Sequence, residues 1–209
     1  MTTLKFITVF LLIALYSCGH QSAKRKINPD AIKLHNKIIP LVNHLDNADS
    51  CKKALTYLDS ATTIDTNYFS GYYEKLMFLS SLNQFDKAVL TINNCIRIKP
   101  YAHELYFTGG ILYERIGDTI SSKIYFTKSL TILNPVLDTM SVNNRDYEML
   151  IGNKAMNLLM LNEDKLLNDL LSNLSDNQIK LDLKKNILAM KSMDRKELIN
   201  RMTSDKYSR

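Results

Sequence analysis

Apolar and small side chains recur along this chain at a fixed interval of 34 residues between His35 and Val136. Three successive segments of 34 residues begin at His35, Phe69 and His103, and each has a large residue at its fourth place: Ile38, Tyr72 and Tyr106. Four later places match in the same way, and they hold Leu45, Leu79 and Tyr113, then Ala54, Ala88 and Ser122, then Leu58, Ile92 and Phe126, and finally Ala61, Cys95 and Ser129. Self-similarity at such a period predicts stacked structural units, none of which can bury its apolar face alone.

This pattern resembles the tetratricopeptide repeat, in which each unit is a hairpin of two helices. Small residues at places 8, 20 and 27 would lie where helices approach closely, and large residues at places 4, 11 and 24 would fill the space between them. The residue at place 8 is small only in the third repeat, as Gly110. The proline that the family has at place 32 occurs only in the second repeat, as Pro100, and in the third repeat Pro135 lies one place later. The resemblance implies an all-α fold, a right-handed superhelix of antiparallel helix hairpins, with repeats at 35–68, 69–102 and 103–136.

Capping residues and prolines predict where the helices begin and end. Asn28 can cap a first helix, and Pro29 suits its first position. Pro40 falls inside this helix and predicts a kink or break near 36–39, because proline removes a backbone hydrogen bond. Pro100 and Pro135 predict helix ends, because the residue before a proline avoids the α region. The other repeat helices are expected at about 50–64, 68–82, 85–98, 102–116 and 119–133.

The C-terminal third keeps helical spacing but lacks the small positions of the repeat. Residues 137–175 are expected to form a loop and then a degenerate fourth helix hairpin. Residues 176–209 should form basic C-terminal capping helices, and Asp194 with Glu197 resembles a capping box at the start of the last one. Because the end of a repeat stack needs a polar outer face, the basic surplus there is interpreted as a solvating cap.

The N-terminal segment has the order of a bacterial secretion signal. Lys5 precedes an apolar run from Phe6 to Tyr16, which is shorter than the roughly 20 residues that span a bilayer. The sequence LYSCG around Cys18 resembles the lipobox of bacterial lipoproteins. We therefore expect a signal peptide at 1–17, lipid attachment at Cys18 and a polar tether over 18–27. An ordinary signal peptide and a buried apolar helix are the alternatives.

The distribution of charge argues against a nucleic-acid partner. The formal net charge is +6, but residues 27–175 hold 14 basic and 16 acidic side chains, so the basic excess lies at the two ends. A nucleic-acid binder is expected to carry a basic stripe along its binding surface. The expected partner is instead an unidentified envelope protein or peptide segment, and the membrane is reached through Cys18.

The sequence contains no motif that predicts catalysis, a cofactor or a metal ion. The four histidines, His20, His35, His44 and His103, do not form a metal-binding spacing and are interpreted as surface side chains. Cys51 and Cys95 would meet oxidising conditions if the chain is secreted, so a disulfide is considered, but their different places in the repeat favour two separate thiols. The chain is therefore expected not to be an enzyme.

The concave face of a tetratricopeptide stack is lined by the first helix of each hairpin, at places 2, 5, 9 and 12. The candidate partner groove is formed by residues at these places, namely Asn36, Asn43, Tyr73, Met77, Phe107, Ile111 and Glu114. Tyr73, Met77, Phe107 and Ile111 would form an apolar strip, and exposed aromatic and methionine side chains commonly mark a partner site. The alternative is that the C-terminal helices of the chain itself cover this strip.

These features predict a lipid-anchored tetratricopeptide scaffold that mediates protein–protein interaction in the bacterial cell envelope. Gly19 after Cys18 favours the outer membrane, with the protein facing the periplasm, by the sorting preference of well-studied lipoproteins. The alternative function is binding of a small molecule or glycan in the same concave face. A peptide partner predicts a long open groove, whereas a small ligand predicts an enclosed pocket ringed by polar groups.

Overall fold

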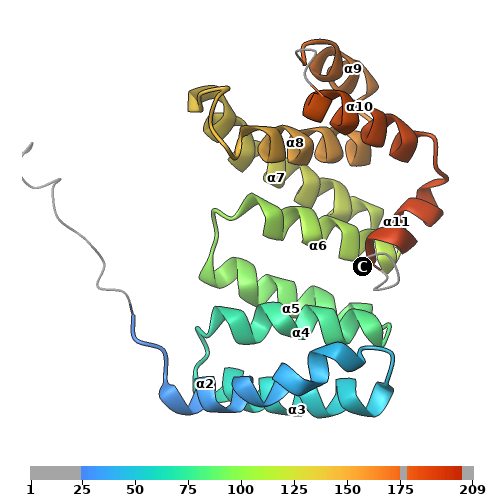
Figure 1. The fold of residues 1–209 in the computed structure, drawn as a ribbon. Coiled ribbons are helices and arrows are strands. Elements are labelled where there is room, and N and C mark those ends of the chain that lie inside the picture. The colour runs from blue at the N-terminus through green and yellow to red at the C-terminus, as the bar shows by residue number, and fades with distance from the viewer. Residues whose placement is uncertain (1–24, 175–177, 204–209) are drawn as a thin grey trace, which may run out of the picture.

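The computed structural model describes residues 25–174 and 178–203, and this part of the chain is all-α. Its helices form antiparallel hairpins that are stacked in the order of the sequence (Figure 1). No strand occurs among the described residues, which include the whole of 69–133. The signal peptide, Cys18 and His20 lie outside the described residues.

The first hairpin contains the expected helix break. Helix α2 (Pro29–His35) begins where Asn28 Oδ1 accepts a hydrogen bond from Asp30 N at 2.9 Å. The helix then changes to a 3-10 helix, η1 (Asn36–His44), which contains Pro40. Because Pro40 has no N–H, the carbonyl of Asn36 has no α-helical partner, and the change of helix type begins at that residue. The predicted break near 36–39 is therefore confirmed.

The other repeat helices, with one exception, lie within two residues of their expected bounds. The first hairpin is completed by α3 (Ala48–Ile64); the second consists of α4 (Phe69–Ser81) and α5 (Phe85–Ile98), and the third of α6 (His103–Arg115) and α7 (Thr119–Thr139). Asn83, with φ of 54°, turns the second hairpin, and Gly117, with φ of 85°, turns the third. Both positions require the left-handed region that glycine and asparagine adopt most readily.

The exception is α7, because Pro135 does not end this helix as predicted. The helix continues to Thr139 and buries Leu133 and Leu137 against Leu150 and Ile151 of α8 (Tyr147–Leu161). Pro135 is exposed, so water can bind the carbonyl oxygen that its missing N–H leaves unpaired. Tertiary packing therefore overrides the local helix-ending signal, and the loop expected at the start of residues 137–175 begins only after Thr139.

The small places of the repeat are buried where helices approach most closely. All six residues at places 20 and 27 are fully buried: Ala54, Ala61, Ala88, Cys95, Ser122 and Ser129. At place 8, a Cβ added to Gly110 would lie 2.5 Å from Cε1 of Phe126 on α7. The large residues at place 24, Leu58, Ile92 and Phe126, are also fully buried. This arrangement is the one that the repeat pattern predicts.

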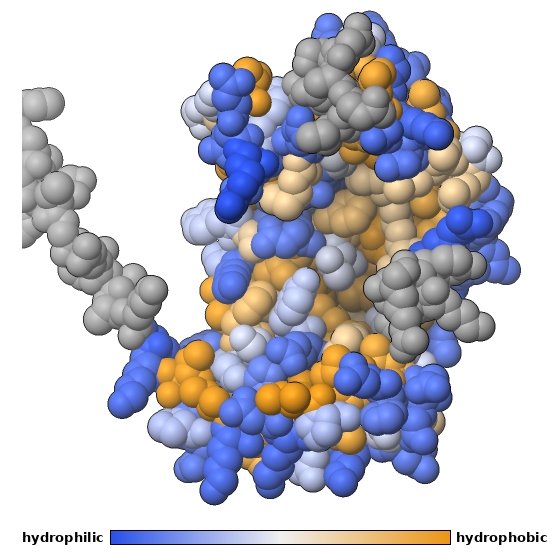
Figure 2. All heavy atoms as spheres, in the orientation of Figure 1, coloured by the Kyte–Doolittle hydropathy of each residue, from blue (hydrophilic) through white to orange (hydrophobic). Residues whose placement is uncertain are grey.

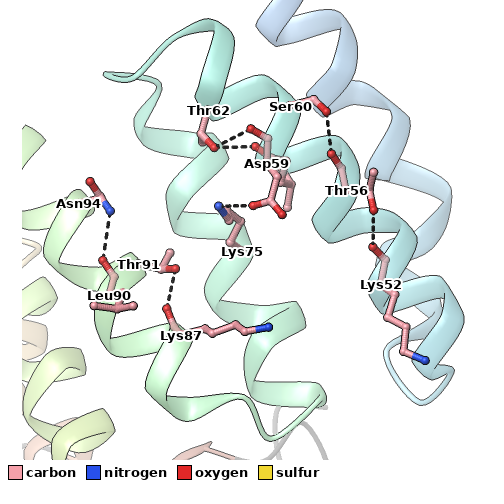
Figure 3. A network of polar contacts seen from close by, with 11 residues as sticks. Lys52, Thr56, Asp59, Ser60, Thr62, Lys75, Lys87, Leu90, Thr91 and Asn94 are labelled. Atoms are coloured by element: carbon pink, nitrogen blue, oxygen red, sulfur yellow. Dashed lines mark hydrogen bonds and ion pairs between the residues drawn. The ribbon is translucent and has the colours of Figure 1, made fainter.

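An ion pair joins the first two hairpins, and buried hydroxyl groups between hairpins form hydrogen bonds within their own helices. Lys75 Nζ of α4 lies 2.5 Å from Asp59 Oδ1 of α3, and Figure 3 shows this ion pair bridging the two helices. In the same view, the buried hydroxyl groups of Thr62 and Thr91 donate to carbonyl oxygens of their own helices, at 2.8 Å from Leu58 O and Lys87 O. Because these hydroxyls are satisfied within one helix, they can be buried between hairpins without an unpaired donor.

The C-terminal helices do not all cap the end of the stack. Helix α9 (Asp164–Ser172) and α10 (Gln178–Lys191) pack beside α8. Helix α11 (Arg195–Thr203) instead returns to α6 of the third hairpin (Figure 1). The expectation that residues 176–209 form only a terminal cap is therefore wrong for α11. Its buried Leu198 and Ile199 explain why it returns, since both join the core formed by Ile111 and Phe126.

Within residues 25–174 and 178–203, no helix combines the length and apolar character needed to cross a bilayer.

Candidate functional site

The concave face is open over the first two hairpins and covered over the third. The three residues at place 5 are equivalent by sequence, but Ile39 is 65% exposed and Tyr73 is 47% exposed. Phe107, at the same place of the third hairpin, is partly buried, and its ring packs on Phe126 at 5.5 Å between centroids. The predicted apolar strip therefore has an open part and a covered part.

Places 9 and 12 show the same gradient, but place 2 does not, because Glu104 in the third hairpin is exposed as Asn36 is in the first. In the first hairpin Asn36 and Asn43 are exposed, and in the second Met77 is half-buried. In the third hairpin Ile111 is only 5% exposed, and the side chain of Glu114 is 11% exposed. The predicted groove residues thus divide into Asn36, Asn43, Tyr73 and Met77, which border the open part, and Phe107, Ile111 and Glu114, which lie under α11 or beside it.

Helix α11 covers the third hairpin through a small apolar contact and two arginine contacts. Arg195 Nη2 lies 2.6 Å from Glu114 Oε1 and donates to Met160 O at 2.8 Å. Arg115 of α6 donates to the Oδ1 atom of Asn200 on α11. Coverage of the strip by the C-terminal helices was one of the two alternatives expected from the sequence, but these contact residues were not predicted. Arg195 and Glu114 are separated by 81 residues, and no local pattern links them.

Apolar surface is visible in the middle of this face. Figure 2 shows apolar atoms over the hollowed centre of the stack, with mixed polar and apolar surfaces at the first hairpin and at the C-terminal helices. Exposed aromatic and aliphatic side chains grouped in a concavity are typical of a surface that binds a partner. The open part can therefore bury apolar side chains of another molecule without rearrangement of the stack.

A histidine and two partners hold the first two hairpins together beside the open part. His35 Nε2 lies 2.8 Å from Glu74 Oε2, and His35 Nδ1 forms a hydrogen bond with the hydroxyl of Tyr68. The prediction that all histidines are surface residues is wrong for His35 and His103, whose side chains are 13% exposed. Burial lowers the pKa of His103 below its ordinary value, and the Glu104 carboxylate opposes this shift.

The last residues of the tether are held against the stack by a buried carboxylate. Asp65 accepts a hydrogen bond from Asn28 N at 3.1 Å, and Arg25 Nη2 lies 2.8 Å from its other oxygen. The Asn28 N–H is the main cause that holds the pKa of Asp65 below its ordinary value, and the Asn67 N–H and Arg25 act in the same direction. These contacts fix the path of the chain from Arg25 onward.

A pocket of about 400 Å³ lies beside this carboxylate and not on the strip. Its lining residues are Arg25, Lys26, Ile27, Asn28, Pro29, Ile64 and Asp65. None of the groove residues lines it, so it lends no support to a small-molecule site in the concave face. Among the described residues, no group of three His, Cys, Asp or Glu side chains is close enough to hold a metal ion.

The two cysteines of the described region belong to separate core clusters and are not joined by a disulfide. Cys51 packs with Ile38 and Leu58, and its Sγ donates to Leu45 O at 3.4 Å. Cys95 packs with Ala88 and Ile92, and burial raises the pKa of its thiol to about 12. A thiol with so high a pKa is a poor nucleophile, because the thiolate is the reactive form. The expectation of two separate thiols is confirmed.

Comparisons with known proteins add little to this description. No protein-family model and no curated protein matches the chain. A solved structure described as "MamA RS-1 ArsTM double mutant" is similar over 79% of this chain and 79% of its own length, at 13% sequence identity and a TM-score of 0.49. That similarity is too low to carry an argument about function, so the assignment as a stack of tetratricopeptide-like hairpins rests on the repeat pattern and on the helices themselves.

Proposed function

We propose that the protein is a scaffold for protein–protein interaction and that its partner site is the open part of the concave face, formed by Ile39, Tyr73 and Met77 with Asn36 and Asn43 beside them. The observation that carries this proposal is the exposure of Ile39 and Tyr73 at equivalent places of neighbouring hairpins. Tyrosine is among the side chains that supply most of the binding energy in many interfaces, and methionine adapts to partner surfaces of different shape.

The partner that fits this surface is an apolar segment of another protein, bound as a helix or in extended form. A helix laid in a groove presents apolar side chains at intervals of three and four residues, and an open strip on stacked helices accepts such a row. The carboxylates of Glu74 and Glu104 lie on the same set of helices and are partly or fully exposed. They favour a partner with basic residues beside its apolar ones.

We further propose that Cys18 is lipidated and that the protein works in the bacterial cell envelope, at the outer membrane. The order of basic residue, apolar run, small residue and cysteine at the N-terminus supports this proposal. From Cys18 to the fixed Arg25 the chain advances by seven residues, which reach at most about 25 Å when extended. A lipid on Cys18 would therefore keep the first hairpin, and the open strip with it, close to the membrane surface.

Affinity capture from detergent-solubilised membranes tests the partner site. Ile39→Asp and Tyr73→Asp place a charge on the open strip and should each reduce the recovered partner at least tenfold, because burying an unpaired carboxylate opposes binding. The matched control is Ile124→Asp, which changes an aliphatic residue that is 61% exposed on α7. The control should recover as much partner as the unchanged protein.

All three variants should keep the thermal midpoint of the unchanged protein within a few degrees, because the replaced side chains are exposed. Equal loss of partner in all three variants would show that added charge, and not the strip, is responsible. A large loss of stability in Ile39→Asp or Tyr73→Asp would show that the strip belongs to the core.

Metabolic labelling with palmitate tests the anchor independently. The label should be incorporated into the unchanged protein and lost on Cys18→Ser, because the thioether or thioester bond requires the sulfur atom of Cys18. The control is Cys95→Ser, which removes a buried thiol and should leave the label unchanged. Labelling that persists in Cys18→Ser would exclude this anchor.

A further inference from the structure

Helix α11 occupies the concave face as a bound peptide would. It follows α10 after only Ser192, Met193 and Asp194, yet it leaves the end of the stack and contacts α6, about 80 residues earlier in the chain. Its contact is made by Leu198 and Ile199, which join the core beside Ile111. Tyr73, at place 5 of the neighbouring hairpin, is 47% exposed.

The chemistry of the contact is a carboxylate that recognises an arginine beside two aliphatic side chains. Glu114 is 11% exposed, and both of its oxygens face Arg195, at 2.6 Å from Nη2 and 3.4 Å from Nε. Ser122 Oγ donates to the same carboxylate at 3.1 Å. A charge-assisted contact with two donors of one guanidinium is directional, so this site selects arginine over an uncharged side chain.

The arginine contact is extended by two further polar groups. Arg195 also donates to Met160 O at the end of α8, where the helix presents unpaired carbonyl oxygens. Arg115 donates to Asn200 of α11, and its guanidinium lies 4.7 Å from the ring centroid of Phe85. The receptor surface for α11 is therefore formed by α6 and the end of α8, with Phe126 of α7 in the same core cluster.

The helix itself is suited to exchange. It has nine residues, and isolated helices of that length are marginal in water. Two of its residues are buried, whereas Lys196, Glu197 and Arg201 are exposed. Its N-terminal Asp194 caps it through hydrogen bonds from Lys196 N and Glu197 N, at 2.9 and 3.1 Å, so the helix start is defined within the segment and needs no other element.

We propose that α11 is an internal ligand of the concave face and that the partner of this protein carries a helix of the same kind, with an arginine three residues before two adjacent aliphatic residues. This inference rests on the proposed scaffold function. When the partner helix displaces α11, the covered residues Phe107 and Ile111 join Tyr73 and Ile39 in one continuous strip. The partner binds only molecules from which α11 is undocked, so its apparent affinity is its intrinsic affinity multiplied by the fraction of such molecules.

A peptide with the sequence of residues 193–203, MDRKELINRMT, is the probe for this site, and fluorescence anisotropy measures its binding to the full chain. The double variant Leu198→Asp with Ile199→Asp removes the apolar contact of the internal helix and leaves its receptor residues unchanged. It should bind the peptide at least tenfold more tightly than the unchanged protein does. Adding Glu114→Lys should abolish this gain, whereas adding Asp138→Lys, at an exposed position of α7, should not.

A charge exchange tests the recognition itself. A peptide in which Arg195 is replaced by glutamate should bind the Glu114→Lys protein better than the unchanged peptide does, because the ion pair is restored with opposite signs. Peptide affinity that does not depend on the charge at position 114 would overturn the proposal. So would equal affinity of the unchanged protein and the Leu198→Asp, Ile199→Asp variant.

Hydrogen exchange on the unchanged protein decides the question if that variant does not fold. Saturating peptide should accelerate exchange of the α11 amides and leave those of α3 and α5 unchanged, since only α11 is displaced. Unaltered exchange in α11 would contradict the proposal. A different result is expected if the proposed scaffold function is wrong but the proposal for α11 is right. Tyr73→Asp would then leave capture of the membrane partner unchanged, while the peptide would still displace α11 from α6.

Discussion

Gly110 and Gly152 both lie inside helices, but their surroundings predict opposite effects of an added methyl group. A Cβ at Gly110 would lie 2.5 Å from the buried ring of Phe126, whereas a Cβ at Gly152 would lie 3.4 Å from Cδ1 of Leu183. The ring of Phe126 is fully buried, and a rigid ring cannot bend away as the end of an aliphatic side chain can. The side-chain end of Leu183 is only partly buried and can adjust.

Gly110→Ala should therefore lower the free energy of unfolding by about 1–2 kcal/mol, because overpacking costs about 1–3 kcal/mol and the gain in helix propensity returns at most about 1 kcal/mol. Gly152→Ala should raise it by about 0.5–1 kcal/mol through helix propensity alone. Urea unfolding at one temperature measures both. A stabilising Gly110→Ala would show that α6 and α7 are further apart than described.

Single residues were well predicted where the repeat pattern states their size. The small places and the apolar place 24 are buried as expected, since the pattern encodes how closely two helices approach. Burial of His35 and His103 was not predicted, because each depends on partners from other helices. The pairing of Arg195 with Glu114 was missed for the same reason, as nothing in either local sequence indicates the other.

Helix α7 shows how packing can overcome a local helix-ending signal. Pro135 lies inside it and leaves the carbonyl of Thr131 without its α-helical partner, on a part of the helix where both residues are exposed. Leu133 and Leu137 on either side of the proline are buried against α8. Burial of two leucine side chains contributes about 3–6 kcal/mol, which exceeds the roughly 3 kcal/mol cost of an internal proline.

Pro135→Ala should consequently stabilise the protein by about 1–3 kcal/mol, because it restores the hydrogen bond to Thr131 O and removes the crowding of the proline ring. Circular dichroism should show the same helix content before and after the change, since the helix already continues to Thr139. A loss of stability would contradict this explanation. An increase of helix content would show that α7 ends earlier in solution.

Helix bounds were predictable because caps, prolines and turn residues are local signals. Asn28 and Pro40 act within a few residues of their own position, and the chain begins a helix or changes helix type where these residues indicate. The place of α11 was not predictable, because a short amphipathic helix can pack on any apolar surface within its reach. The sequence indicates its existence and its apolar side, and only the fold decides what it covers.

At the scale of the whole molecule, the concave face has one part that is open and one part that α11 covers. The first two hairpins leave Ile39 and Tyr73 exposed, and α11 covers the third hairpin at Ile111. Repeat stacks can be extended or covered locally, because each unit contacts mainly its neighbours. In the function proposed above, a partner first binds the open region and then enlarges the site by displacing α11.

Site-specific photo-cross-linking tests the proposed binding surface most directly. A photoreactive amino acid at position 39 or 73 should give an adduct with the captured membrane partner, because both positions are exposed on the concave strip. The same group at position 90, which is 67% exposed on α5, should give none. Adducts at 39 and 73 but not at 90 are the predicted result. An adduct at 90 with none at 39 or 73 would contradict the proposed site.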